Sequence, residues 1–532
     1  MKKILFYTLA LIAGLNFTSC NEWLDKNPDD RAELNTNEKV TSLLVSAYPT
    51  HSPALILEMS SDNMGDNTDS YSPSQNHDAL YRFVPVETEG NDDPRAVWNA
   101  LYETVASANY AIEAINELGG YKNDMEGQYA EALLCRAYAM FELANTFCMA
   151  YDPTKASQYV GLPYPKVVST DITAVEPRGT LEELYKNLDE DIETALPLMN
   201  DNHLTTPKYH FNTRAGYAFA ARFNLYYQKW DKAVKYADKV LGTGDPTALL
   251  RNWSYYANDL AGAQDICNHY MLTSETANIM LLNAYSLLGR TQYSKYRYNH
   301  NYDMVAYETF WAKSPFGNGS SANTLIWANM MYGSNQGVYL PKIIEQFEYT
   351  DKVNLTGYAH VVHSVFTTDE TLLVRAEANA QLKNYEAALK DMNYWTLTHC
   401  NAKKGMNTRP TFTVDYINEF FNGTEDGSKA GMDYSPVTPE TNRERTIRKI
   451  MNPQGFTIEE GTQENMLQII LYMRRLEGIW EGWRFIDCKR YGIEYTHFIE
   501  GGTNVVFKAG DLRGAIQLPN DVINAGMEAN PR

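Results

Sequence analysis

Three segments of the chain share one pattern, in which small apolar residues are followed by arginine. They read ALLCRAYAM (132–140), FAARFNLYY (219–227) and LLVRAEANA (372–380). The second continues to Trp230 with Ala233, and the third to Tyr385 with Ala388. Small residues where two helices cross, with an aromatic residue at the turn, are typical of tetratricopeptide-type helix pairs of about 34 residues. The copies are unevenly spaced, so insertions separate them and the chain is not a regular solenoid.

Apolar residues recur at helical spacing through much of the remaining chain. The predicted helices cover 38–48, 94–117, 126–147, 179–198, 212–228, 230–241, a helix pair within 367–397, and one strong pattern over 463–492. Residues 57–78 and 401–460 are polar and read as loops. We therefore expect an all-α, or α-rich, fold with little strand. In it, repeat helices at about 94–241 and 367–397 support a loop-rich part.

That loop-rich part is an insert at about 243–350, which is rich in Tyr, Trp, Asn, Ser and Gly. Neither a helical nor a strand period is sustained there. A long irregular segment in a compact protein is usually functional or disordered, and this many aromatic residues argue against disorder. The insert is therefore the first place to expect a binding site.

The first twenty residues have the anatomy of a secretory signal. Lys2 and Lys3 precede an apolar run over 4–15, and small polar residues lead to Cys20. The run is too short to span a membrane, which takes about 20 apolar residues. Cys20 stands where a bacterial lipoprotein carries its acylated cysteine; the alternative is an ordinary cleaved signal with a chance cysteine. We expect a lipoprotein signal at 1–19, lipidation of Cys20, an acidic tether at 20–37 and one domain over 38–532.

Charge and cysteine content exclude several classes of protein. The formal net charge is −20 and the pI about 5.0, which argues against nucleic acid, because its binding depends on Lys and Arg. No other stretch reaches about 18 apolar residues, so the lipid is the only membrane element that we expect from the sequence. Without Cys20 an odd five cysteines remain, widely spaced and with no CxxC pair. They do not form a disulfide framework.

Catalytic and metal motifs are weak. HExxH, GxSxG and GxxxxGK[ST] do not occur in the sequence. His360 and His363 have H-x-x-H spacing without a neighbouring Cys or carboxylate, and a structural role is favoured over a metal site. The stretch DNMGDNTDS is similar to calcium loops but lacks their spacing and closing Glu. We expect no enzyme activity, no metal and no cofactor.

Arginines and acids crowd the segment 474–492. Arg484 and Asp487 are three residues apart, and Glu477 and Glu481 four apart, on what reads as one helix. We interpret them as a structural network that fixes this helix to its neighbours. Arg484→Ala should then lower stability and leave ligand affinity unchanged in the folded protein.

Motifs spread over nearly the whole chain resemble those of the SusD/RagB family of outer-membrane nutrient-binding lipoproteins of Bacteroidota. They are Cys20 with NEWLDKNPDD, Trp98 with Leu101-Tyr102 and Asn109, LLCRAYAMFEL leading into GLPYP, the repeat helices at 372–392, EGWRFIDCKRYG at 481–492 and the tail LPNDVINAGMEANP. The most specific is the motif at 481–492. The resemblance implies repeat helices that support a loop-rich ligand site, and a SusC-like TonB-dependent transporter that the lipoprotein caps like a hinged lid.

Aromatic and amide residues in loops are the candidate ligand site. The chain has 38 Tyr and 9 Trp, and a sugar site needs a flat aromatic platform with a few polar hydrogen-bonding groups. Two stretches, 62–71 and 293–332, supply both. The candidates are Asp66, Asn67, Tyr71, Tyr296, Trp311 and Trp327. The alternative for each aromatic residue is core packing.

We therefore expect a non-catalytic lipoprotein on the outer face of the cell outer membrane. It would capture oligosaccharide and deliver it to the SusC-like transporter. Two alternatives remain. A peptide could be the ligand, because Tyr-rich irregular surfaces also suit peptides, or the protein could be a structural lid that binds little ligand of its own.

Overall fold

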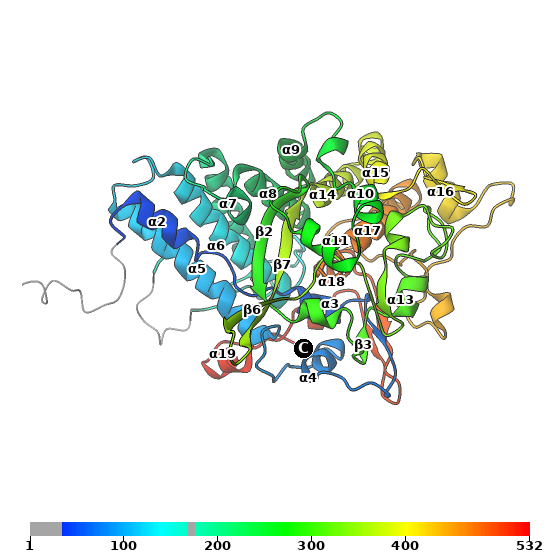
Figure 1. The fold of residues 1–532 in the computed structure, drawn as a ribbon, viewed down its shortest axis with the longest axis horizontal. Helices are drawn as coiled ribbons and strands as arrows, with labels where there is room; N and C mark the ends of the chain where they lie inside the picture. Colours follow the sequence, from blue (N-terminus) through cyan, green and yellow to red (C-terminus); the bar gives the residue numbers. More distant parts are fainter. Residues whose placement is uncertain (1–33, 169–175) are drawn as a thin grey trace, which may run out of the picture.

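The structure is a computed structural model, and it describes residues 34–168 and 176–532. These residues form 18 α-helices, one three-stranded sheet and several two-stranded ribbons (Figure 1). The fold is α-rich, as predicted. Within the described ranges, no helix combines the length and apolar character needed to cross a bilayer. The predicted signal, Cys20 and most of the tether lie outside the described residues.

Helix pairs stack side by side along one side of the molecule (Figure 1). The first set is α2 (Asn37–Leu44), α5 (Pro94–Glu117), α6 (Glu126–Phe147), α7 (Leu181–Ala195), α8 (Thr213–Tyr226) and α9 (Trp230–Leu241). The second set is α14 (Thr368–Gln381), α15 (Tyr385–His399) and α17 (Thr462–Glu477). Helix α14 packs against both α8 and α9, which joins the two sets. Buried apolar side chains form one connected cluster from α2 to Leu518.

The arginine of each repeat segment explains why the pattern recurs. Arg136 on α6 makes two 2.7 Å hydrogen bonds to Asp191 on α7. Arg375 on α14 pairs in the same two-pronged way with Asp391 on α15, at 2.9 and 2.7 Å. The third repeat arginine, on α8, reaches the first turn of α14, where both its bonds to Glu370 are 2.5 Å long. Each arginine therefore links its helix to another helix through a buried, geometrically specific pair.

The C-terminal motif differs from its prediction as a single helix. Helix α17 ends at Glu477, and α18 (Trp483–Tyr491) begins after five intervening residues. Between them Trp480 and Gly482 have φ angles of 64° and 80°, in the left-handed region that ends a helix. The apolar period continues through this turn, because both helices are buried. For this reason the sequence pattern does not reveal the break.

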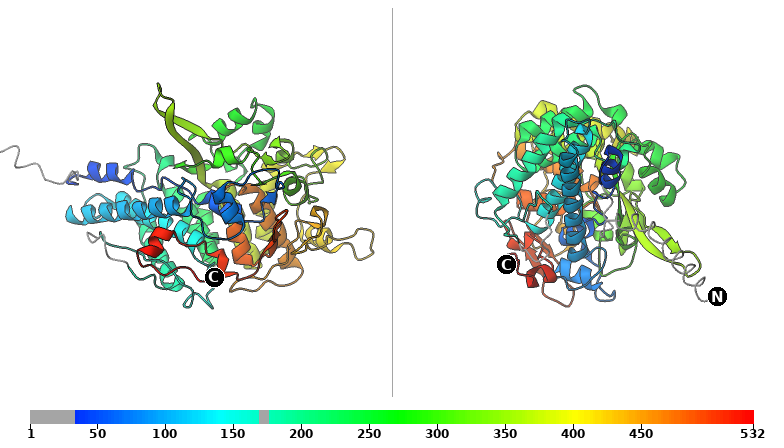
Figure 2. Two further views of the ribbon diagram at one scale, coloured as in Figure 1. Left: turned by 90° about the horizontal axis from the view of Figure 1, so that it is seen from below. Right: turned by 90° about the vertical axis from the view of Figure 1, so that its left-hand side faces the viewer.

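One antiparallel sheet lies in and beside the insert. Strands β2 (Asn278–Tyr285), β7 (Thr356–Thr367) and β6 (Gln346–Asp351) are arranged in the order β2-β7-β6. The sequence did not predict it. Strand β2, NIMLLNAY, is buried at most positions, so it lacks the alternation that marks a half-exposed strand. Beyond β2, the β6–β7 hairpin projects from the body of the molecule (Figure 2).

Short helices were also missed where loops were predicted. They are α3 (Ala54–Ser60), α4 (Gln75–Tyr81), α10 (Trp253–Asn258), α11 (Ala263–Tyr270), α13 (Tyr302–Tyr307) and α16 (Val414–Asn422). Most have fewer than nine residues, which is too few for a helical period to be recognised. In addition, residues 58–65 are buried, although 57–78 was predicted as a polar loop.

Candidate functional site

The two stretches predicted to carry ligand contacts lie against each other. Strand β1 (Gly65–Asp66) pairs antiparallel with β3 (Tyr298–Asn299). This ladder brings 62–71 onto the start of 293–332, across more than two hundred positions of sequence. The packing is close, because a Cβ atom added at Gly65 would lie 2.8 Å from the side-chain nitrogen of Asn301.

Asn67 uses its amide to hold the site together. Its backbone N–H donates to the carbonyl oxygen of Arg297 at 2.7 Å. Its side-chain nitrogen donates to the carbonyl oxygens of Tyr296 at 2.8 Å and Gln336 at 2.7 Å. Its side-chain oxygen accepts from the side chain of Asn301 at 3.1 Å. Asn67 is therefore a positioning residue for three loops.

Asp66 is also held by the protein. Its carboxylate pairs with the Arg297 guanidinium at 3.1 Å, and its side chain is only 5% exposed. It accepts from the backbone N–H groups of Thr68 at 2.9 Å and Glu500 at 2.8 Å. The same guanidinium donates to the carbonyl oxygen of Glu500 at 2.6 Å. Asp66 therefore ties the loop at 62–71 to the C-terminal region.

Tyr71 and Tyr296 are half-buried at the edge of this region. The ring of Tyr296 packs edge-to-face on His77, with 4.9 Å between ring centroids and 85° between planes. His77 is nearly fully buried, and burial lowers its pKa to about 4. Its ring is therefore neutral near pH 7.

Trp311 and Tyr302 form a rigid aromatic pair at the surface. The indole N–H of Trp311 donates to the carbonyl oxygen of Ala328 at 2.8 Å, which fixes the half-buried ring. Tyr302, at the start of α13, lies 5.6 Å away centroid to centroid and is 47% exposed. Asn301 caps the same helix by accepting from the Met304 N–H. A fixed ring beside an exposed ring is the kind of platform on which a sugar face stacks.

A second group of tyrosines continues this surface. Tyr332 and Tyr339 face each other across the hairpin of β4 (Tyr332–Ser334) and β5 (Gly337–Tyr339). Tyr339 lies 6.3 Å from Tyr332 and 6.0 Å from Tyr293, which is 45% exposed. The hairpin turn joins the first pair, because the Tyr302 N–H donates to the carbonyl oxygen of Asn335. We name Tyr293, Tyr302, Trp311, Tyr332 and Tyr339 the aromatic strip.

Besides Tyr332, which ends the predicted stretch 293–332, three members of the aromatic strip were not among the six candidates: Tyr293, Tyr302 and Tyr339. All three belong to the predicted insert, and none is part of a regular helical or strand pattern of apolar residues. The signal that could have found Tyr302 is the preceding asparagine, a preferred residue at the start of a helix. No comparable local signal marks the other two.

Trp327 lies in the core. It is 0% exposed. Its ring packs at right angles to Trp253, at 5.1 Å, and to His399, at 4.9 Å. A stacking platform needs an exposed face, and Trp327 offers none in this structure.

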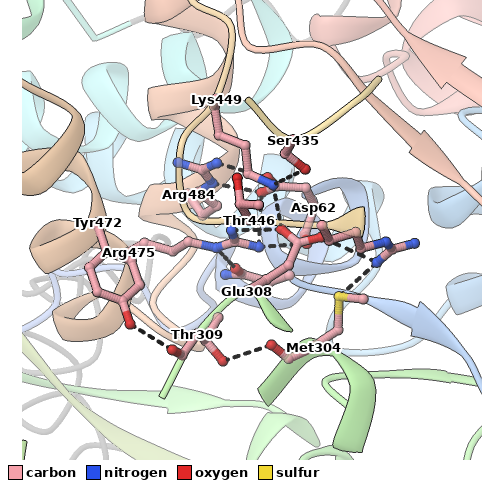
Figure 3. Close-up of polar contacts among 12 residues, drawn as sticks. Asp62, Met304, Glu308, Thr309, Ser435, Thr446, Lys449, Tyr472, Arg475 and Arg484 are labelled. Atoms are coloured by element: carbon pink, nitrogen blue, oxygen red, sulfur yellow. Dashed lines mark hydrogen bonds and ion pairs between the residues drawn. The ribbon is translucent and has the colours of Figure 1, made fainter. Parts of the chain in front are cut away.

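A buried ionic network connects the site loops to the C-terminal motif (Figure 3). It comprises two carboxylates and four cations: Asp62, Glu308, Arg445, Lys449, Arg475 and Arg484. Asp62 precedes β1, and Glu308 follows α13. Arg475 lies on α17 and contacts both carboxylates, at 3.5 Å and 2.9 Å. The network therefore holds the two ligand-candidate loops on the helical scaffold.

The network holds its carboxylates in the charged form. Burial would raise the pKa of Glu308, but Lys449, Arg475 and Arg445 outweigh it and lower that pKa to about 2. Burial also opposes ionisation of Asp62, yet Arg475 and Arg484 hold its pKa well below the usual range. The predicted structural network is present, with a different partner. Arg484 pairs with Asp62, whereas Asp487 pairs with Arg474 and Arg490.

The two histidines on β7 lie in different surroundings. His363 lies 3.3 Å from a carboxylate oxygen of Glu481. His360 is half-buried at the register position opposite Tyr285. In the part of the chain that the structure describes, His, Cys, Asp and Glu side chains nowhere gather in threes that could hold a metal ion.

A hollow of about 620 Å³ lies away from the aromatic strip. Its walls come from α2, the start of α6 and residues 200–205, and its lining is mostly amide, hydroxyl and carboxylate groups. Neither Tyr nor Trp lines it. Without an aromatic platform, this hollow fits a stacked sugar ring less well than the aromatic strip does.

The fold and the strip together define an architecture in which repeat helices support a loop-borne aromatic surface. Residues 22–225 match the model of a SusD-like family described as "Starch-binding associating with outer membrane". A comparison with curated proteins gives no match.

Solved structures with the same fold cover nearly the whole chain. A SusD superfamily protein from Bacteroides thetaiotaomicron VPI-5482 is 16% identical, with a TM-score of 0.61 over 93% of this chain and 98% of that one. A SusD-like carbohydrate binding protein from Bacteroides vulgatus ATCC 8482 is also 16% identical, with a TM-score of 0.58 over 91% and 95%. The chain therefore has the fold of these SusD superfamily structures, and its first part, residues 22–225, is similar in sequence to the SusD-like family.

Proposed function

We propose that this protein captures oligosaccharide on the aromatic strip and delivers it to a SusC-like TonB-dependent transporter. The observation that carries the proposal is the fixed Trp311 ring beside the exposed Tyr302 ring. Exposed amide side chains lie close by in sequence, at Asn318, Asn329 and Asn335. The description of the matching family and the name of the carbohydrate-binding relative support a glycan as the ligand.

The proposed site differs from the six residues named from the sequence. Tyr71, Tyr296 and Trp311 stay as candidate contacts, with Tyr293, Tyr302, Tyr332 and Tyr339 added. Asp66 and Asn67 act by positioning, since protein groups already occupy their side chains. Trp327 is left out because it is buried.

The proposed location is the external face of the outer membrane, with a lipid on Cys20 as anchor. Residues 20–37 would act as a tether and 38–532 as a single binding domain. One acyl chain gives marginal attachment, and two or more give stable anchoring. This arrangement would leave the domain free to open and close over a barrel.

A glycan array followed by calorimetry with the best-binding oligosaccharide tests the proposal. Tyr302→Ala should weaken binding about tenfold, equivalent to about 1.4 kcal/mol. The matched control is Tyr255→Ala, which removes a similarly exposed tyrosine (41%) from α10, outside the strip. Equal affinity for the two variants would contradict the strip as the site.

Two outcomes would favour the alternatives. Binding of peptides but of no glycan would assign the strip to peptide capture. Co-purification with the transporter, together with intact transport by a variant lacking both Tyr302 and Trp311 side chains, would favour a structural lid. An enzyme remains unsupported, because the strip contains no nucleophile beside a base.

A further inference from the structure

The β6–β7 hairpin extends beyond its sheet. The last paired position of β2 is Tyr285, opposite His360, so past this point β7 pairs with β6 alone. Figure 2 shows this two-stranded part projecting into solvent. We name residues 346–358 the arm. A two-stranded ribbon by itself is only marginally stable in water. Unless such a ribbon has a partner, we expect its exposed side chains to be mostly polar.

The arm instead exposes large apolar side chains. At the tip, Val353 is 91% exposed and Leu355 69% exposed. Closer to the body, Tyr349 is 49%, Tyr358 55% and Phe347 40% exposed. Phe347 and Tyr349 pack on each other, with 4.8 Å between ring centroids. Exposed apolar side chains that gather in this way mark a surface that meets a protein or a membrane.

The turn is built to present these residues. The Asp351 carboxylate accepts from the backbone N–H groups of Val353 at 2.8 Å and Asn354 at 3.1 Å. Leu355 has a φ of 54°, a backbone conformation that favours glycine or asparagine. An aliphatic residue at such a position, with its side chain in water, is not explained by the stability of the turn.

Pairing with a second copy of the chain is disfavoured at the free edge of β6. A register shift lies between Tyr349 and Asp351, and a bulge of this kind twists an edge away from further strands. Glu348 also places a charge on the arm, which is a common protection against edge pairing.

The order of residues along the arm matches the depth profile of a lipid bilayer. Aliphatic side chains stand at the tip, where a membrane is most apolar, and aromatic side chains follow, as they do at membrane interfaces. Lys352 is the one basic residue of the arm, beside Glu348 and Asp351. The arm therefore suits an uncharged lipid surface better than an anionic one.

We propose that the arm inserts its tip into the surface of a lipid bilayer and sets the orientation of the protein on it. This inference rests on the proposed function in one respect, because the lipid on Cys20 would hold the protein near the membrane. Residues 21–33, between that cysteine and the described structure, would limit the distance. With the anchor in place, even weak insertion becomes effective by local concentration.

Selective labelling of the tip tests the proposal. The five cysteines in the described ranges are all buried, so a thiol-reactive, environment-sensitive dye will label Val353→Cys selectively. The protein would begin at residue 21 and carry no lipid, and the probe is a phosphatidylcholine vesicle. We expect a blue shift of the dye and its quenching by lipids brominated along the acyl chain. Dye at Ser320→Cys, on another exposed loop, should show neither.

Leu355→Asp in the labelled chain should abolish the shift, with the circular dichroism spectrum unchanged. Absence of any shift, both in this chain and in the chain acylated at Cys20, would overturn the proposal. A blue shift of the dye that appears without vesicles as the protein concentration rises would also overturn the proposal, because it would indicate that the tip contacts protein. Mass spectrometry of Cys20 tests acylation, and calorimetry tests glycan binding; neither measurement depends on the arm. A negative result for membrane insertion is therefore distinguishable from failure of the proposed function.

Discussion

The ion pair between Arg484 and Asp62 joins the C-terminal motif to the candidate site. The guanidinium of Arg484, on α18, makes hydrogen bonds of 2.6 and 2.7 Å to the two carboxylate oxygens of Asp62. The two side chains are 3% and 4% exposed. Arg475 also contacts Asp62, at 3.5 Å.

Arg484→Ala should destabilise the protein by about 3 kcal/mol at pH 7. Removing one partner of a buried ion pair costs about 3–5 kcal/mol, because the other charge stays buried. We expect the lower end, since Arg475 still contacts Asp62. Urea unfolding, followed by circular dichroism, measures the loss.

Arg290→Ala is the matched control for this variant. Arg290 also makes a two-pronged pair, at 2.8 and 2.6 Å from Glu345, but its side chain is 46% exposed. An exposed pair of this geometry should contribute less than about 1 kcal/mol. If Arg484→Ala costs no more than Arg290→Ala, the reasoning about burial is refuted.

The pH dependence gives a second readout. The pKa of Asp62 is depressed in the folded protein, so its pairing stabilises above the unfolded pKa of about 3.9 and is lost as pH falls through the folded pKa. Arg484→Ala should raise the folded pKa and shift acid unfolding to higher pH. Replacing both partners with apolar residues should recover much of the stability. Glycan affinity of the folded fraction should stay within about twofold, because neither residue belongs to the aromatic strip.

Three further predictions concern other parts of the chain. Cys20→Ala should abolish labelling by a palmitate analogue and impair glycan uptake by cells, while the purified protein binds as before; lost binding would contradict this division of roles. Burial would raise the pKa of Glu131, but its contacts with His203 and His210, both 2.7 Å, lower it. Below about pH 4.5 the free energy of unfolding should therefore fall more steeply with pH for the native protein than for Glu131→Gln. Parallel curves of unfolding free energy against pH would disprove this. Burial lowers the pKa of Lys489 to about 7, so between pH 7 and about 10 the unfolded chain binds more protons than the folded protein. The stability of the native protein should therefore rise across this range relative to that of Lys489→Met. If urea unfolding shows a stability difference between the two that does not change with pH, the prediction is refuted.

The repeat helices could be predicted from the sequence with accurate bounds. Helices α5, α6 and α9 begin and end at the predicted residues. Each is long, with an apolar stripe that records locally which side is buried. Gly242, with a φ of 74°, follows the last residue of α9, where glycine commonly ends a helix. Local periodicity suffices wherever one face of a long helix is buried.

The sheet and the helix break could not be predicted in this way. Strand β2 and helices α17 and α18 are buried on nearly all sides. Full burial removes the contrast between apolar and polar faces on which both the helical and the strand period depend. The left-handed turn at Trp480 and Gly482 is a tertiary requirement that leaves only a weak mark in the sequence.

The sequence by itself determined the helical scaffold. It also predicted a lipoprotein signal in the first twenty residues and two stretches that would form a site. Only the tertiary structure decided which aromatic rings are available there. Trp311 and Trp327 stand in similar sequence surroundings, yet one is half-buried at the surface and the other is fully buried. Asn67 reaches Tyr296 and Gln336 across more than two hundred residues. Exposure and long-range pairing depend on the whole packed chain, and no local pattern of residues encodes them.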